Sequence, residues 1–117
     1  MDNRAKKLLF DVLDSGRSIR QWCSSRSFAA YEQDRQLRRA VEREFEIIGE
    51  ALSRLIQAAP GTAARIDELH RIIGFRNRII HGYDAIDDAA VWGVVDSHLP
   101  RLVAEVETLL EEAGEPV

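Results

Sequence analysis

The chain has little of what small extracellular or membrane-bound proteins need. It contains one cysteine, Cys23, which cannot form a disulfide within the chain, so a reducing compartment is expected. Its longest uncharged and mostly apolar run, residues 89–95, is far shorter than the roughly 20 residues of a membrane-spanning helix. No charged-then-apolar leader opens the sequence. These features predict a cytoplasmic protein that does not enter a membrane.

The chain also lacks the excess of basic residues typical of a dedicated nucleic-acid coat, because its net charge is -4. Positive charge is nevertheless concentrated locally. Between residues 65 and 83 four arginines stand against two acidic residues: Arg65, Arg71, Arg76 and Arg78 against Asp67 and Glu68. A local binding site for an anion is therefore compatible with the negative net charge of the whole chain.

No segment shows the alternation of apolar and polar residues that marks a half-buried strand, whereas apolar residues recur at helical spacing almost throughout. At 117 residues the chain can build one hydrophobic core and not two. We therefore expect a single domain over residues 1–117, all-α, folded as an up-down bundle of four main helices plus a short extra helix.

The first helix is expected from about Asn3 to Trp22, with Trp22 on or near its apolar stripe. Ser15 and Gly16 weaken its middle, so a kink or break is expected there. A polar joint follows, in which Ser27 is an expected N-cap for a short helical turn.

The second helix is expected from about Asp34 until Pro60, and the third from within a few residues of Thr62 until Gly82. Asp87 is the expected cap of the last helix, which continues to about residue 113. Pro100 lies inside that last pattern and is expected to bend or divide it.

The most informative segment, residues 76–83, places an arginine, a histidine and a tyrosine around one expected helix end. The Arg76 guanidinium is suited to forked hydrogen bonds with phosphate oxygens, and His81 can transfer a proton near neutral pH. The helix dipole favours a protonated His81, which suits a general acid. This pattern indicates phosphodiester chemistry. One Arg-His pair offers few groups for moving two protons and stabilising the phosphate, whereas two protomers that each contribute a pair would supply enough.

Ordinary structural roles compete with this interpretation. Five residues separate Arg76 from His81, which puts their side chains about 140° apart on an ideal helix. Both residues can also be simple partners of a helix C-terminus, with Asn77 and Tyr83 tying down the loop. The histidines are widely spaced with no cysteine or paired carboxylates nearby, so we expect neither a metal site nor a cofactor, and His98 is expected to pack between helices.

With these motifs the chain resembles the HepT-like toxins of the HEPN (higher eukaryotes and prokaryotes nucleotide-binding) superfamily. The matching pieces are residues 45–51, which include Gly49 and Glu50, Arg76-Asn77 with His81-Gly82-Tyr83, and residues 84–92. Gly49 is expected to let a neighbouring helix or chain approach closely, and Glu50 to pair with an arginine there.

The resemblance implies a helical homodimer with a composite Arg-His site at the interface and metal-independent endoribonuclease activity on an RNA substrate. Arg76 and His81 would be catalytic, and Asn77 would contact the phosphate; Arg78 is a further candidate for phosphate and RNA binding. Tyr83 would be the residue to which a minimal nucleotidyltransferase antitoxin adds AMP. The alternative is a noncatalytic helical subunit that binds nucleotide or docks a nucleotidyltransferase.

Overall fold

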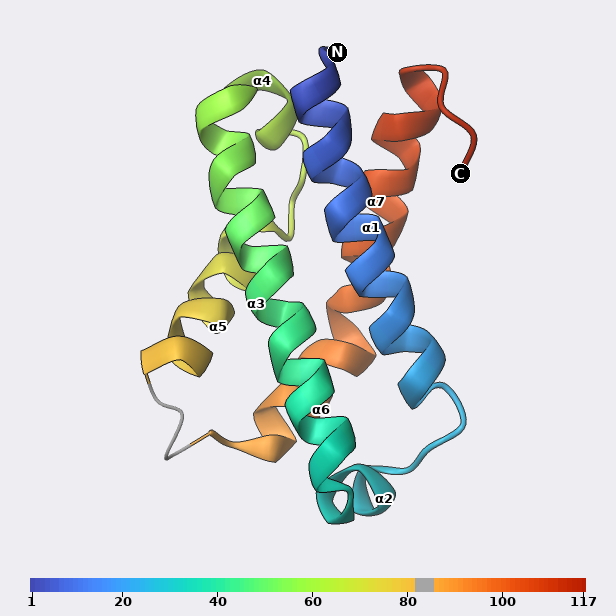
Figure 1. Ribbon diagram of the computed structural model, residues 1–117, viewed down its shortest axis with the longest axis vertical. Coiled ribbons are helices and arrows are strands. Elements are labelled where there is room, and N and C mark those ends of the chain that lie inside the picture. The colour runs from blue at the N-terminus through green and yellow to red at the C-terminus, as the bar shows by residue number, and fades with distance from the viewer. Residues whose placement is uncertain (82–85) are drawn as a thin grey trace.

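A computed structural model of the protein describes residues 1–81 and 86–117, except for the side chains of Ile80 and His81. The described residues form seven helices and no strand, which confirms the all-α prediction (Figure 1). The helices are α1 (Asn3–Cys23), α2 (Phe28–Gln33), α3 (Arg35–Ala58), α4 (Pro60–Ala63), α5 (Leu69–His81), α6 (Asp88–Ser97) and α7 (Leu99–Glu112). Among them, none is both long enough and apolar enough to cross a membrane.

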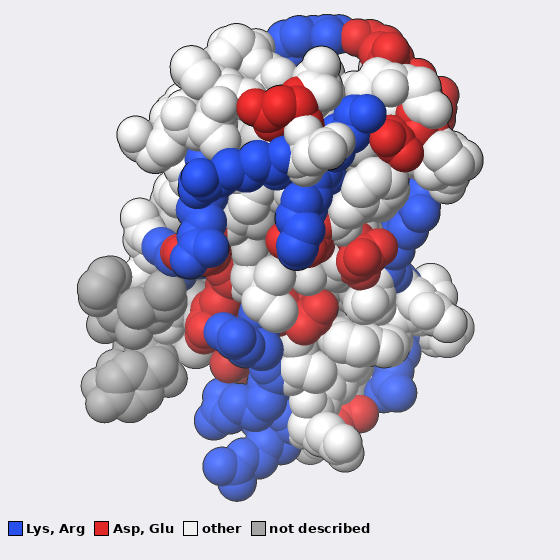
Figure 2. All heavy atoms as spheres, turned by 45° about the horizontal axis from the view of Figure 1, so that its top comes forward, with Lys and Arg blue, Asp and Glu red and all other residues white. Residues whose placement is uncertain are grey.

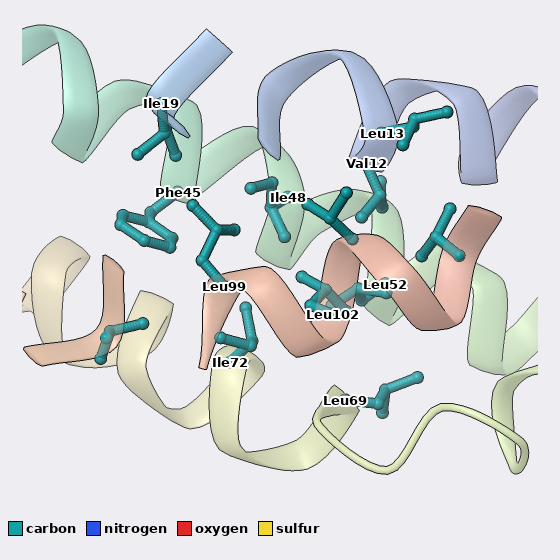
Figure 3. Packing of buried hydrophobic residues seen from close by; sticks show 14 of the residues in the cluster. Val12, Leu13, Ile19, Phe45, Ile48, Leu52, Leu69, Ile72, Leu99 and Leu102 are labelled. Carbon is teal, nitrogen blue, oxygen red and sulfur yellow. The ribbon is translucent and has the colours of Figure 1, made fainter. Parts of the chain in front are cut away.

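The long helices α1 and α3 lie side by side and form the centre of the bundle. On its other side α1 packs along α7, and α5 packs on α3 at the left of Figure 1. The apolar stripes of α1, α3, α5 and α7 meet in one core (Figure 3), whose members include Val12, Leu13, Ile19, Phe45, Ile48, Leu52, Leu69, Ile72, Leu99 and Leu102. Helix α5 is therefore fixed to the bundle by one apolar face, and its other residues remain for a site.

Short polar side chains fix where the helices begin. Ser27 accepts a hydrogen bond from the backbone N–H of Ala30 at 3.1 Å, and Asp87 accepts from Ala89 and Ala90. Both expected N-caps are confirmed. Asp34 also caps α3, by accepting from the N–H of Leu37 at 3.0 Å.

The expected break in the first helix is wrong, because α1 runs without interruption through Ser15 and Gly16. The glycine serves packing instead. A Cβ at Gly16 would lie 2.8 Å from Cγ2 of Val103, so the missing side chain lets α7 approach α1 closely. Trp22 was also misplaced by the sequence pattern, since 39% of its surface is exposed near the end of α1.

The third helix begins later than predicted. Residues 60–63 form the separate short helix α4, with Pro60 in its first turn, and α5 starts only at Leu69. The turn before α5 is held by Glu105 of α7, whose carboxylate accepts hydrogen bonds from the backbone N–H groups of Asp67 at 2.7 Å and Glu68 at 3.2 Å. This long-range cap has no signal in the local sequence.

The last expected helix is divided into α6 and α7 near Pro100. Of the two expected effects of this proline, bending or division, the structure shows division. Pro100 occupies the first turn of α7, where a proline's missing N–H leaves no helical hydrogen bond unmade. Helix α7 ends before Gly114, which adopts a φ of +84° that favours glycine.

Candidate functional site

Arg76 lies on the face of α5 that packs against α3, at the point where α3 has a glycine. A Cβ at Gly49 would lie 2.4 Å from Cγ and 2.5 Å from Cβ of Arg76, closer than such atoms can approach. The expected role of Gly49 is therefore confirmed: it makes room for the stem of an arginine from the neighbouring helix. Only 18% of the Arg76 side chain is exposed.

The Arg76 guanidinium is held by two oxygen acceptors. Its Nη2 donates to Oε2 of Glu50 at 2.6 Å, and its Nη1 donates to Oδ1 of Asn77 at 2.8 Å. The Nε atom is buried and has no hydrogen-bond partner among the described residues. The expected pairing of Glu50 with an arginine is confirmed, and the Arg76 head has a defined orientation.

Glu50 also binds a second arginine. Its Oε1 accepts a hydrogen bond from Nε of Arg54, one helical turn further along α3, at 2.9 Å. One carboxylate therefore bridges two guanidinium groups, which leaves the cluster Arg54–Glu50–Arg76 with one net positive charge. Sequence reasoning missed Arg54, although its spacing of four residues from Glu50 is a known signal for a helical ion pair.

The apolar side of α5 is anchored next to Arg76. Phe75 packs edge to face on Phe45 of α3, with ring centroids 5.0 Å apart. On the outer side of Phe75, the Arg78 guanidinium carbon lies 6.0 Å from the ring centroid. Arg78 and Asn77 are both exposed on α5, so these two predicted RNA-binding residues lie at the surface near Arg76.

His81 is the last residue of α5, five positions after Arg76 on the same helix. Its side chain lies outside the described residues, as does the whole of Tyr83. The predicted catalytic role of His81 and the predicted modification of Tyr83 therefore remain predictions.

A second polar cluster joins the start of α5 to α7. The buried Glu68 carboxylate lies 3.1 Å from Nδ1 of His98, 3.3 Å from Nη1 of Arg101 and 3.6 Å from Nε of Arg71. His98 thus lies between helices, as its expected packing role requires. Among the side chains that the structure describes, which do not include His81, no group of three potential metal ligands comes together.

Comparison with known proteins finds ribonucleases among the relatives of this chain. A family model described as "Ribonuclease HepT-like" matches residues 12–109, which is most of the chain. The match includes α3, α5 and all the residues of the candidate site.

Curated relatives agree with this match. A protein of Methanocaldococcus jannaschii named "Putative RNase MJ1380" is 31% identical over 102 residues, covering 87% of this chain and 93% of its own length. A second from that organism, "Putative RNase MJ0127", is 23% identical and covers 92% and 88% of the two chains. A protein of Caldanaerobacter subterraneus, "Putative RNase TTE0752", is 29% identical and covers 74% and 76%. No solved structure matches the chain at a comparable significance.

Proposed function

We propose a function from the premise that the chain belongs to the HepT-like ribonuclease family: it is an endoribonuclease that cleaves RNA without a metal ion, using Arg76 and His81. The observation that carries the proposal is the fixed Arg76 head group, oriented by Glu50 and Asn77 on the helix that ends at His81. A rigid guanidinium is suited to binding a phosphate whose charge increases in the transition state.

The reaction assigns one task to each group. Attack of a 2′-hydroxyl on the adjacent phosphorus forms the new P–O bond and breaks the bond to the 5′-oxygen of the next nucleotide. His81 transfers a proton as acid or base, and Arg76 stabilises the negative charge on the pentacoordinate phosphate. Asn77 and Arg78 contact the RNA phosphates from the exposed side of α5.

The active species is a homodimer. A single chain contributes one Arg76–His81 pair, whereas cleavage requires one group to remove a proton, another to donate one, and cations for the phosphate. A twofold interface that brings two such pairs to one cleft supplies all of them. Sedimentation at micromolar concentration is expected to show a dimer, and a fully active monomer would contradict this part of the proposal.

In its host the protein acts as the toxin of a toxin–antitoxin pair. Its partner is a minimal nucleotidyltransferase that inactivates it by adding AMP to Tyr83, two positions after His81 in the sequence. The burial of the other tyrosine supports this choice, since Tyr31 is 0% exposed and its hydroxyl is inaccessible to an enzyme. Mass spectrometry after incubation with ATP, magnesium and the cognate nucleotidyltransferase is expected to find AMP on Tyr83, and a Tyr83→Phe chain that is still neutralised would exclude this mechanism.

Inducible expression without the antitoxin tests the function in cells. Wild type is expected to arrest growth and to fragment cellular RNA, and Arg76→Ala at equal protein level is expected to do neither. Arg71→Ala is the matched control, because Arg71 is an exposed arginine on the same helix whose ion pair among the described residues is with Glu68. Growth arrest by Arg76→Ala equal to that of wild type would refute the catalytic assignment.

A further inference from the structure

The ion pairs that the arginines of α3 make with glutamates of the same helix differ in net charge. Arg39 pairs with Glu42, and Arg43 pairs with Glu46, each at 3.2 Å, so these pairs hold one positive and one negative charge. Arg54 instead shares the Glu50 carboxylate with Arg76. The positive charge of this group is therefore only half neutralised.

The two arginines bound to Glu50 differ in their freedom to move. Arg76 is enclosed by Gly49, Glu50 and Asn77. The Arg54 side chain is 62% exposed and makes one charged contact, through its Nε atom. Its two terminal nitrogens make no hydrogen bond to the described residues, and they remain available to a ligand in solvent.

Figure 2 shows acidic and basic side chains interleaved over the face to which α1 and α3 contribute. A hollow between the two helices is lined by the charged residues Arg43, Glu46, Glu50 and Arg54 of α3, by Asp11 of α1, which pairs with Lys7, and by the apolar residues Leu8, Ile47 and Ala51. An extended strand of RNA held at Arg76 can therefore reach the exposed side chain of Arg54.

We infer that Arg54 binds the RNA phosphate next to the one bound by Arg76. This inference rests on the proposed function and adds a second phosphate-binding position to it. Because Arg54 and Arg76 bind opposite oxygens of one carboxylate, their separation is within the reach of one nucleotide of an extended strand. Glu50 stays paired with Arg76 when Arg54 turns its terminal nitrogens to the phosphate, so no buried charge loses its partner.

The experiment measures binding of a single-stranded RNA that cannot be cleaved because every 2′-hydroxyl is methylated. Fluorescence anisotropy across a salt series compares wild type, Arg54→Ala, Arg54→Lys and Arg43→Ala. Arg43→Ala is the matched control, since Arg43 lies on the same face of α3, is 68% exposed and is neutralised by its own carboxylate.

Arg54→Ala is expected to weaken binding about tenfold at low salt. The slope of log K against log salt is expected to fall in magnitude by about 0.7, because one cation no longer pairs with a phosphate. Arg54→Lys should retain most of that slope, because it keeps the charge. Arg43→Ala should bind like wild type. Equal binding and equal slopes for Arg54→Ala and wild type would overturn the inference, and so would an equal loss for Arg43→Ala.

A purely structural role for Arg54, acting through Glu50 on Arg76, would have a different signature. In that case Arg54→Ala would lower kcat for cleavable RNA and leave the salt slope of binding unchanged. That result would count against phosphate binding by Arg54. The proposed function is separable from the inference. If wild type binds the methylated RNA with an Arg54-dependent slope but fails to cleave unmodified RNA, the nuclease proposal fails and the phosphate position stands. If wild type does not bind RNA, both fail.

Discussion

The Arg76 side chain lies directly on Gly49, in the space that any other residue's Cβ would occupy. The stem atoms Cβ, Cγ and Cδ of Arg76 are 2.4 to 2.9 Å from the position of that Cβ. The Cβ atom of Arg76 is fixed by the backbone of α5, so rotation of the side chain cannot relieve this contact. The position of the proposed phosphate-binding group thus depends on a residue without a side chain on another helix.

Gly49→Ala is therefore expected to push α5 away from α3 and to displace the Arg76 head group. The predicted result is a loss of RNA cleavage of about 10²-fold, because small misplacements of a catalytic group are costly. Cleavage rate and thermal unfolding should be measured together, to show that the variant is still folded.

Gly93→Ala is the control for the general effect of replacing a helical glycine. Gly93 lies in α6, and a Cβ there would have no atom within 4 Å. This variant should be more stable than wild type by about 1 kcal/mol or less and should cleave at the wild-type rate. If Gly49→Ala cleaves as fast as Gly93→Ala, the close contact does not position Arg76.

A second prediction concerns the cluster that joins α5 to α7. The carboxylate of the buried Glu68 lies within 3.6 Å of charged or polar nitrogens of Arg71, His98 and Arg101, and Glu68→Ala removes it. The free energy of unfolding is expected to fall by about 1 to 3 kcal/mol. The loss should lie near the lower value, because Arg71 and Arg101 can turn to water once the carboxylate is gone. Urea unfolding measures this loss.

The exposed pair Arg43–Glu46 supplies the comparison for that measurement. Glu46→Ala is expected to change the free energy of unfolding by no more than about 0.5 kcal/mol. A loss in Glu68→Ala no larger than in Glu46→Ala would show that the buried cluster does not stabilise the fold.

The third prediction is a dependence of stability on pH. Burial raises the pKa of the Glu42 carboxyl above its ordinary value of 4.5, and the hydrogen bond from Arg39, together with its charge, offsets part of this rise. Because the folded chain holds this proton more tightly than the unfolded chain, the contribution of Glu42 to stability is complete below pH 4.5 and is lost as pH rises through the raised pKa.

Glu42→Gln carries a neutral group at every pH and should not show this loss. The Tm difference between Glu42→Gln and wild type is therefore expected to be more positive at pH 7 than at pH 4. Glu46→Gln, at a more exposed position, is the control and should show a smaller change between the two pH values. A Tm difference for Glu42→Gln that is constant with pH, or that becomes more negative at pH 7, would contradict the prediction.

Local signals in the sequence predicted most of the helices. Ser27 and Asp87 are capping residues at helix starts, and Pro100 lies where one helix gives way to the next, so each acts through its own backbone neighbourhood. The failures involve partners that are distant in sequence. Gly16 weakens an isolated helix, yet it is packed against Val103 here, and the delayed start of α5 depends on Glu105.

At the candidate site, too, residue types could be predicted from the sequence and contacts between distant residues could not. The chemistry of Arg76 and the small size of Gly49 were visible as residue types, and the sequence also led to the expectation that Glu50 pairs with an arginine at the close approach. The pair Arg54–Glu50 lies within α3 and could have been predicted from its spacing of four residues, whereas the contact of Arg76 with Gly49 and its pairing with Glu50 follow from the packing of α5 on α3. Sequence spacing within one helix cannot supply contacts between two helices.

The most direct test of the central claim is the rate at which the purified protein cleaves single-stranded RNA in the presence of EDTA. Wild type is expected to cleave, and Arg76→Ala and His81→Ala are each expected to be slower by about 10²- to 10⁴-fold. Arg71→Ala, which replaces an exposed arginine of the same helix outside the proposed site, should stay within about twofold of wild type. Cleavage by Arg76→Ala and His81→Ala at the wild-type rate, or abolition of wild-type cleavage by EDTA, would contradict the account.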